Sequence, residues 1–99
     1  MMLTWVMYDI PDDTTRNKIA SLCLDYGLRR LQKSVFCGDQ GTKAMLQLAD
    51  RINDVVKEGD EGARILLMAA CERCVSGIIS IGTPFSPEDF RYPRLVIIG

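Results

Sequence analysis

The chain has 99 residues, of which 47% are hydrophobic and 25% charged, a composition typical of one soluble globular domain rather than of a disordered chain. No apolar run approaches the roughly 18 residues of a membrane span, and the start lacks the features of a signal peptide, so we expect no membrane association and a cytoplasmic location. Histidine is absent and the net charge is −1, which excludes Ser-His-Asp and Cys-His catalysis and restricts nucleic-acid binding to a local basic patch.

An apolar run over residues 3–9 predicts the first strand, and its last residue is Asp9. Both faces of this strand are apolar, as in a central strand. Because Pro11 ends the strand, Asp9 is expected at the rim of the core, where a carboxylate can be partly desolvated and directed at a ligand. The alternative is that Asp9 only ends a strand and accepts hydrogen bonds from turn amides.

A helix is predicted next, with Asp12 and Asp13 as caps and Gly27 as its C-terminal stop. Its apolar stripe follows i, i+3, i+4, i+7 spacing and consists of Ile19, Leu22, Cys23 and Tyr26. Apolar and polar residues alternate over residues 29–38 and predict a second strand. Thr42 is the expected N-cap of a second helix that ends between Gly59 and Gly62, and its buried stripe is Met45, Leu48, Ala49, Ile52 and Val56.

Residues 64–70 predict a third strand, 71–76 a turn and 75–81 a fourth strand. We interpret the order as βαββαβ, the pattern of an α+β ferredoxin-like domain over residues 1–82, with an antiparallel sheet and both helices on one face. Residues 83–99 are expected to be a linker and a short fifth strand over 95–98. That strand pairs either with its own sheet or with the sheet of a partner, which would lock a homodimer.

Five cations against the single acid Asp25 form a basic cluster in this otherwise acidic chain: Arg16, Lys18, Arg29, Arg30 and Lys33. Arginine side chains suit phosphate groups, so we consider this cluster a candidate for tracking the backbone of a duplex. The alternative is an ordinary solvated helix face and strand edge.

The four cysteines are expected to be reduced, since the chain lacks export signals. Cys71 and Cys74 have the C-x-x-C spacing of a zinc or redox pair. A zinc site would need two further ligands, and Cys23 and Cys37 would supply them only if the fold brought all four thiols together. Because Cys23 belongs to the buried helix stripe, we interpret the pair Cys71 and Cys74 as part of a structural turn. A zinc-to-protein ratio near zero in the purified protein would agree with that interpretation.

Three segments together resemble the CRISPR-associated protein 2 family: Val6–Asp13, Arg16 with Lys18, and Tyr26–Phe36. Cys71–Cys74 followed by Ile79–Gly82 is similar to the family's third-strand turn and fourth strand. The resemblance implies a ferredoxin-like homodimer in CRISPR adaptation that bridges the CRISPR-associated protein 1 integrase and holds the DNA to be inserted as a spacer. It also implies metal-dependent endonuclease activity on RNA or duplex DNA for several relatives.

Asp9 falls on the family's metal-binding aspartate, whereas Cys37 occupies a position where the family often has glutamate. Mg²⁺, or Mn²⁺ in its place, usually accepts one or two protein carboxylates, and a two-fold axis near the end of the first strand would supply two copies of Asp9. The bound metal would then activate water for attack on a phosphodiester, with Asp9 as the catalytic residue. Tyr8, Ser34 and Phe36 are assigned as supporting residues, although Ser34 has no histidine to activate it.

Three functional hypotheses follow. The first is an adaptor that positions DNA and docks the integrase, and the second is a metal-dependent nuclease in which Asp9 is essential. The third is a non-catalytic ferredoxin-like dimer that regulates or binds a ligand between its protomers.

Overall fold

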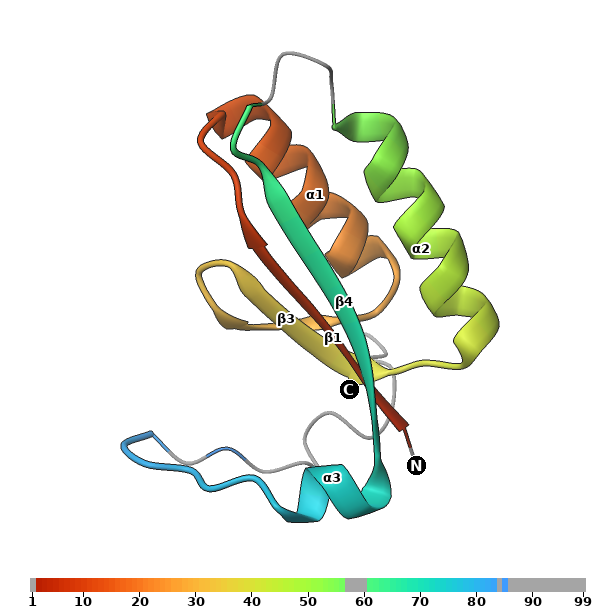
Figure 1. Ribbon diagram of the computed structural model, residues 1–99, viewed down its shortest axis with the longest axis vertical. Helices are drawn as coiled ribbons and strands as arrows, with labels where there is room; N and C mark the ends of the chain where they lie inside the picture. The colour runs from red at the N-terminus through yellow and green to blue at the C-terminus, as the bar shows by residue number, and fades with distance from the viewer. Residues whose placement is uncertain (1, 57–60, 84, 86–99) are drawn as a thin grey trace, which may run out of the picture.

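The computed structural model describes residues 2–56, 61–83 and 85 (Figure 1). These residues form four strands and three helices, which are, in chain order, β1 (Met2–Asp9), α1 (Asp13–Asp25), β2 (Arg29–Gln32), β3 (Val35–Asp39), α2 (Thr42–Val55), β4 (Arg64–Cys71) and α3 (Glu72–Ser76). The first six elements have the order βαββαβ that was assigned to the domain, although the individually predicted strands would give βαβαββ, and α3 follows β4 directly.

The strands form one antiparallel sheet in the order β2-β3-β1-β4. The central position of β1 explains why its residues are apolar on both faces. It pairs with β3 from Leu3↔Asp39 to Met7↔Val35 and with β4 over its whole length, from Met2↔Cys71 to Asp9↔Arg64. Helices α1 and α2 lie side by side on one face of the sheet (Figure 1). The predicted α+β ferredoxin-like class is therefore confirmed.

The main core lies between this face of the sheet and the two helices, and we call the face the closed face. Strand β1 contributes Val6 and Tyr8 to it, and Phe36 of β3 is completely buried there. The helices contribute the residues that their apolar stripes predicted, Ile19 and Cys23 from α1 and Leu48 and Ile52 from α2. Burial of these side chains supplies most of the apolar stabilisation of the domain.

The opposite face of the sheet, which we call the open face, has a second and smaller core at one end. Because side chains alternate along a strand, Leu3, Trp5 and Met7 of β1 point to this face. Leu3 packs with Cys37, Ala70 and Val75, and the partly buried residues Trp5, Leu31 and Phe85 pack against this cluster. Phe85 covers Trp5, with ring centroids 5.5 Å apart.

The ends of α1 follow their predicted signals. Asp12 is the N-cap, and its side chain accepts a hydrogen bond from the Thr15 N–H at 2.8 Å. Gly27 has a φ of +83°, a conformation that favours glycine, and its N–H donates to the Leu24 carbonyl. The helix therefore stops where the sequence indicated.

The N-cap of α2 differs from the prediction. Gly41 is the N-cap, with no side-chain hydrogen bond, and Thr42 is the first helical residue. The reason is that Gly41 has the extended backbone of a cap, with φ −75° and ψ 161°, and glycine is accepted at that position almost as well as threonine. Helix α2 ends at Val55, whereas Gly59 and Asp60 lie outside the described residues.

Two strand predictions were wrong. Residues 29–38, expected as one strand, form two strands, β2 and β3, because the chain reverses at the polar pair Lys33-Ser34 so that β3 can pair with β1. Residues 75–81, expected as a strand, are not one. Part of this segment belongs to α3, and α3 turns the chain away from the sheet, so the apolar run Ile78–Ile81 has no neighbouring strand among the described residues. The fifth strand expected over 95–98 lies outside the described residues.

Candidate metal and nucleic-acid site

Asp9 is the last residue of β1 and is exposed. It continues the alternation of Leu3, Trp5 and Met7 and therefore lies on the open face. In the sheet register it stands directly opposite Arg64, the first residue of β4. The two residues border a hollow of about 210 Å³ that Met7, Tyr8 and Leu66 also line. A carboxylate and a guanidinium thus share one end of the open face.

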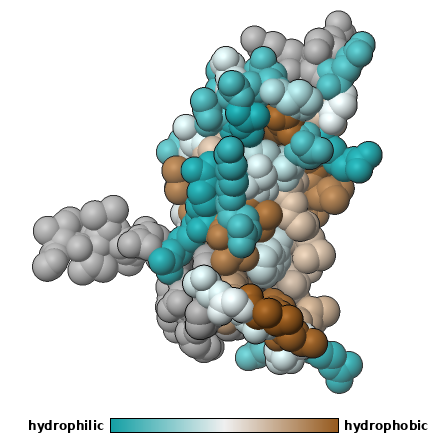
Figure 2. Space-filling view, turned by 90° about the vertical axis from the view of Figure 1, so that its left-hand side faces the viewer, coloured by the Kyte–Doolittle hydropathy of each residue, from teal (hydrophilic) through white to brown (hydrophobic). Residues whose placement is uncertain are grey.

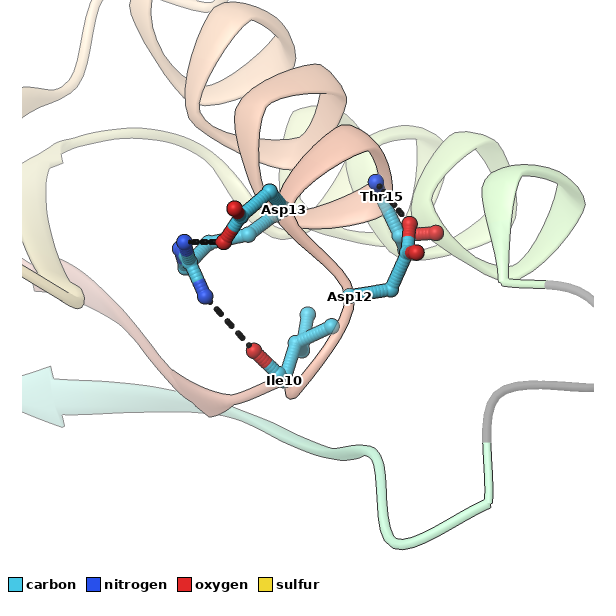
Figure 3. Close-up of polar contacts among 5 residues, drawn as sticks. Ile10, Asp12, Asp13 and Thr15 are labelled. Atoms are coloured by element: carbon cyan, nitrogen blue, oxygen red, sulfur yellow. Dashed lines mark hydrogen bonds and ion pairs between the residues drawn. The ribbon is translucent and has the colours of Figure 1, made fainter.

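The turn that follows Asp9 is held by three polar contacts (Figure 3). Arg16 donates a hydrogen bond from Nη1 to the Ile10 carbonyl at 3.0 Å and forms an ion pair with Asp13, while Asp12 caps α1 through Thr15. Ile10 itself is buried. These contacts occupy the carboxylates of Asp12 and Asp13, whereas the side chain of Asp9 has no hydrogen bond or ion pair within residues 2–56, 61–83 and 85. The observed turn therefore holds the backbone near Asp9 without using its carboxylate.

One chain supplies few ligands for a metal ion. Among the described residues there is no group of three or more cysteine, aspartate or glutamate side chains that would hold one. Cys37, at the position where the family often has glutamate, is completely buried, and burial raises the pKa of its thiol to about 12. Since Cys37 stays protonated at neutral pH and pairs with Trp5, four residues from Asp9 along β1, it offers no anionic ligand beside Asp9. Asp9 fits Mg²⁺ as one of the one or two carboxylates that this ion accepts, if a second copy of the chain provides the other.

Two members of the predicted basic cluster lie near Asp9. Arg16 contacts the Ile10 carbonyl, one residue beyond Asp9. Lys33 is exposed in the turn between β2 and β3, and the next residue, Ser34, accepts a hydrogen bond from the Tyr8 N–H at 3.1 Å. The turn with Lys33 therefore lies beside the end of β1.

The other three cations are spread over different surfaces. Arg29 stands opposite Cys37 and Arg30 opposite Phe36, so the two arginines point to opposite faces of the sheet. Arg30 stacks over the Phe36 ring, with its guanidinium carbon 5.0 Å from the ring centroid. Lys18 borders a hollow of about 480 Å³ between α1 and Val55. The five cations therefore do not form one continuous patch on a single chain.

The residues predicted to support the site belong to the framework behind it. Tyr8 is buried on the closed face, where its ring lies near that of Phe36 with centroids 6.3 Å apart. Ser34 contributes its backbone carbonyl to the sheet, and Phe36 lies in the main core. These residues hold the end of β1 in place through contacts on the closed face and through the backbone of the sheet.

The structure adds residues that the sequence did not single out. Leu66 and Met68 of β4 are 55% and 48% exposed, and their register partners Met7 and Trp5 place them on the open face with Asp9. Residues 65–70 are apolar throughout, so the sequence did not indicate which of them face solvent. Arg64 was missed because the register of two strands far apart in the sequence cannot be deduced from the sequence.

In the described part of the chain, every helix is too short or too polar to cross a lipid bilayer.

Comparison with known proteins identifies the family. The sequence model for CRISPR associated protein Cas2 matches residues 1–78. A CRISPR-associated endoribonuclease Cas2 of Pyrobaculum aerophilum is 35% identical over 83 residues, which cover 84% of this chain and 89% of the relative. One from Chloroflexus aurantiacus is 38% identical over 87 residues, which cover 88% and 91%.

Solved structures agree with this result. A hypothetical protein from Thermus thermophilus superposes with a TM-score of 0.68 at 30% identity, over 84% of this chain and 94% of that one. Cas2 of Streptococcus pyogenes has a TM-score of 0.65 at 23% identity, over 83% and 100%, and supports the fold. Since the family model and these relatives cover most of the chain, the protein belongs to the CRISPR-associated Cas2 family.

Proposed function

We propose that this chain acts as a homodimer in CRISPR adaptation, where it holds DNA for spacer acquisition and bridges the CRISPR-associated protein 1 integrase. We propose further that two copies of Asp9 bind Mg²⁺ or Mn²⁺ and permit endonuclease activity on RNA or DNA. The observation that carries the proposal is the location of Asp9 on the same open face as the exposed Leu66 and Met68. Relatives named endoribonucleases support the nuclease part, and the resemblance to the family supports the adaptation part.

The chemistry of the open face supports the proposed dimer. Two large apolar side chains, Leu66 and Met68, project from a regular strand toward solvent. In a two-fold dimer the same patch would be used on both chains, so these side chains would cover one another. The arrangement would also bring the two Asp9 residues toward one axis at the end of β1.

Two Asp9 carboxylates across such an axis form the oxygen donor set that a hard divalent cation prefers. When bound, the cation supplies positive charge at the scissile phosphate and a water of lowered pKa. The chain's own contribution is to hold Asp9 at a fixed strand end, which the contacts of Arg16 with Ile10 and Asp13 stabilise. Arg64 and Lys33, at the same end of the sheet, are suited to bind phosphate oxygens.

The proposal is tested with Asp9→Asn, which keeps the size of the side chain and removes its charge. Asp50→Asn, at an exposed position of α2, is the matched control. Three measurements are made on each variant: binding of Mn²⁺ by electron paramagnetic resonance, Mg²⁺-dependent cleavage of RNA and duplex DNA, and spacer acquisition in cells. We expect Asp9→Asn to lose Mn²⁺ binding and at least about 100-fold of the cleavage rate, as when a metal ligand is removed.

The acquisition assay separates the two parts of the proposal. Retained acquisition with lost cleavage would establish the adaptor role and make the chemistry incidental. Lost acquisition in a correctly folded dimer would show that the carboxylates are required for adaptation. Unchanged Mn²⁺ binding and cleavage in Asp9→Asn would reject the metal site, and a monomeric wild-type protein would reject the dimer.

The nucleic-acid surface is tested separately with Lys18→Ala, Arg29→Ala, Arg30→Ala and Lys33→Ala. Exposed Lys43 on α2 provides the control, Lys43→Ala. Each lost phosphate contact is expected to weaken duplex binding and to reduce the slope of log K against log salt by about one. Arg16→Ala is less informative, because Arg16 also holds the turn after β1. Equal affinity and salt slope in all these variants would remove the cluster from the interface.

A further inference from the structure

A pair of exposed thiols lies at the junction of β4 and α3. Cys71 is the last residue of β4 and the N-cap of α3, and Cys74 lies in the first turn of that helix. Both side chains are exposed, and their Sγ atoms are 3.6 Å apart. A rotation of the side chains that shortens this separation by about 1.5 Å would reach the length of an S–S bond.

The other two cysteines are in a different environment. Cys23 and Cys37 are completely buried, one on each side of the sheet. Burial raises the pKa of each thiol to about 12, so both stay protonated and unreactive at neutral pH. The chain therefore carries one accessible pair of thiols and two inaccessible thiols that serve as internal controls.

The accessible pair is chemically asymmetric. The backbone N–H of Cys74, and then its thiol, favour the thiolate form of Cys71 and lower the pKa of Cys71 below its ordinary value. The contact with the Cys71 sulfur, together with its charge, raises the pKa of Cys74. Because the thiolate is the nucleophile in thiol–disulfide exchange, Cys71 is the attacking residue and Cys74 the resolving one.

We propose that Cys71 and Cys74 form a thiol–disulfide exchange site whose substrates are small-molecule disulfides such as oxidised glutathione. The Cys71 thiolate attacks one sulfur of the disulfide, which forms a mixed disulfide and releases the first small thiolate. Cys74 then loses its proton and attacks the Cys71 sulfur, which forms the intrachain bond and releases the second thiolate. The two protein thiols lose two electrons and two protons, and the small disulfide becomes two thiols.

The new bond would tie the N-cap of α3 to the first turn of the helix. This helix carries Val75, which is buried in the core of the open face, and it leads into the exposed residues Ile78, Ile79 and Ile81. Figure 2 shows hydrophobic surface at the lower end of the molecule, the end where α3 lies in Figure 1. Oxidation would therefore fix the direction in which this apolar segment leaves the sheet. The inference does not depend on the proposed nuclease or adaptor function.

The experiment uses the reduced full-length protein in buffers of increasing ratio of oxidised to reduced glutathione. The samples are quenched with acid, the remaining thiols are alkylated, and the intact mass is measured. We expect wild-type protein to lose two of its four thiols together and the mass of two hydrogens, with reversal by dithiothreitol. Cys74→Ser should stop at a mixed disulfide that carries one glutathionyl group on Cys71. Cys71→Ser should react about tenfold more slowly, because it lacks the thiol whose pKa is lowered beside the N–H of Cys74.

Four outcomes would overturn the proposal. They are equal reactivity of all four thiols, two stable glutathionyl groups on the wild-type chain, disulfides that link two chains and increase with protein concentration, and no reaction in fully oxidised glutathione. Circular dichroism of both serine variants verifies that they are folded, and fragmentation of the oxidised protein locates the bond between Cys71 and Cys74.

Discussion

The two faces of the sheet differ in what covers them, although the same strands build both. On the closed face, α1 and α2 bury Val6, Tyr8 and Phe36. On the open face, α3 and Phe85 cover only the end around Leu3 and Trp5, and Leu66 and Met68 project into solvent. The difference indicates that the closed face stabilises the single chain, whereas the exposed part of the open face is available for association.

The largest expected effect comes from the closed face. Phe36→Ala removes a completely buried ring that contacts Tyr8 and lies beneath Arg30. We expect it to lower the free energy of unfolding by about 3–5 kcal/mol, at any protein concentration. Urea denaturation followed by circular dichroism measures the change, and Phe36→Leu provides a milder variant if the alanine protein does not fold.

Met68→Ala on the open face is the matched comparison. We expect its effect on unfolding to depend on protein concentration, since it would act through the dimer. An effect as large as that of Phe36→Ala at the lowest concentrations would show that the two faces do not differ in this way.

The second-largest expected effect is on the association of two chains. Leu66→Asp places a charge beside Met7 and the exposed Met68 on the open face, and it should weaken the proposed dimer by at least about 30-fold, which corresponds to about 2 kcal/mol. The control is Leu46→Asp on α2, because Leu46 is 58% exposed and Leu66 is 55% exposed. Sedimentation velocity over a dilution series compares the two variants. If both variants dissociate equally, or if neither does, the open face is not the interface.

The smallest expected difference between the two faces is in the pH dependence of stability, in which they should behave alike. Cys23 on the closed face and Cys37 on the open face both have a pKa of about 12 in the folded chain, against an ordinary value of 9. Since the unfolded thiols ionise first, stability should fall as the pH rises from about 9 to about 12, by up to about 1.4 kcal/mol per pH unit for each thiol.

Urea denaturation between pH 8 and pH 11, roughly the range over which free thiols ionise, compares wild-type protein with Cys23→Ala and Cys37→Ala. Each substitution should reduce the slope of stability against pH by a similar amount. A smaller change for Cys37→Ala would mean that solvent reaches Cys37 from the open face. Cys37 would then be less well shielded from water than Cys23.

Local signals in the sequence were sufficient for much of the fold. The apolar run that ends at Asp9, the cap at Asp12 and the glycine at position 27 predicted β1 and both ends of α1. In contrast, the reversal at Lys33-Ser34 was missed, because nothing local showed that β3 must return to pair with β1. The strand expected over 75–81 failed for a related reason. A β-branched run shows that a segment can pair, but it does not show whether a neighbouring strand exists.

The candidate site was predictable only in part. The place of Asp9 at the end of the central strand followed from the residues around it. The separation of Arg29 from Arg30 required the pairing of β2 with β3, and the position of Arg64 opposite Asp9 required the register of β1 with β4. Long-range pairing, rather than local propensity, decides which side chains share a surface.

The central position of β1 also has a consequence for the order in which the protein folds. Strand β1 is the first element of the chain, yet its longest ladder is with β4, where Met2 pairs with Cys71 and Asp9 with Arg64. Contacts between distant segments are slow to form because a long loop must close first. During synthesis, one edge of β1 and its apolar open face therefore stay unpaired until residues 64–71 are available. This period of synthesis is when the nascent chain is most exposed to aggregation.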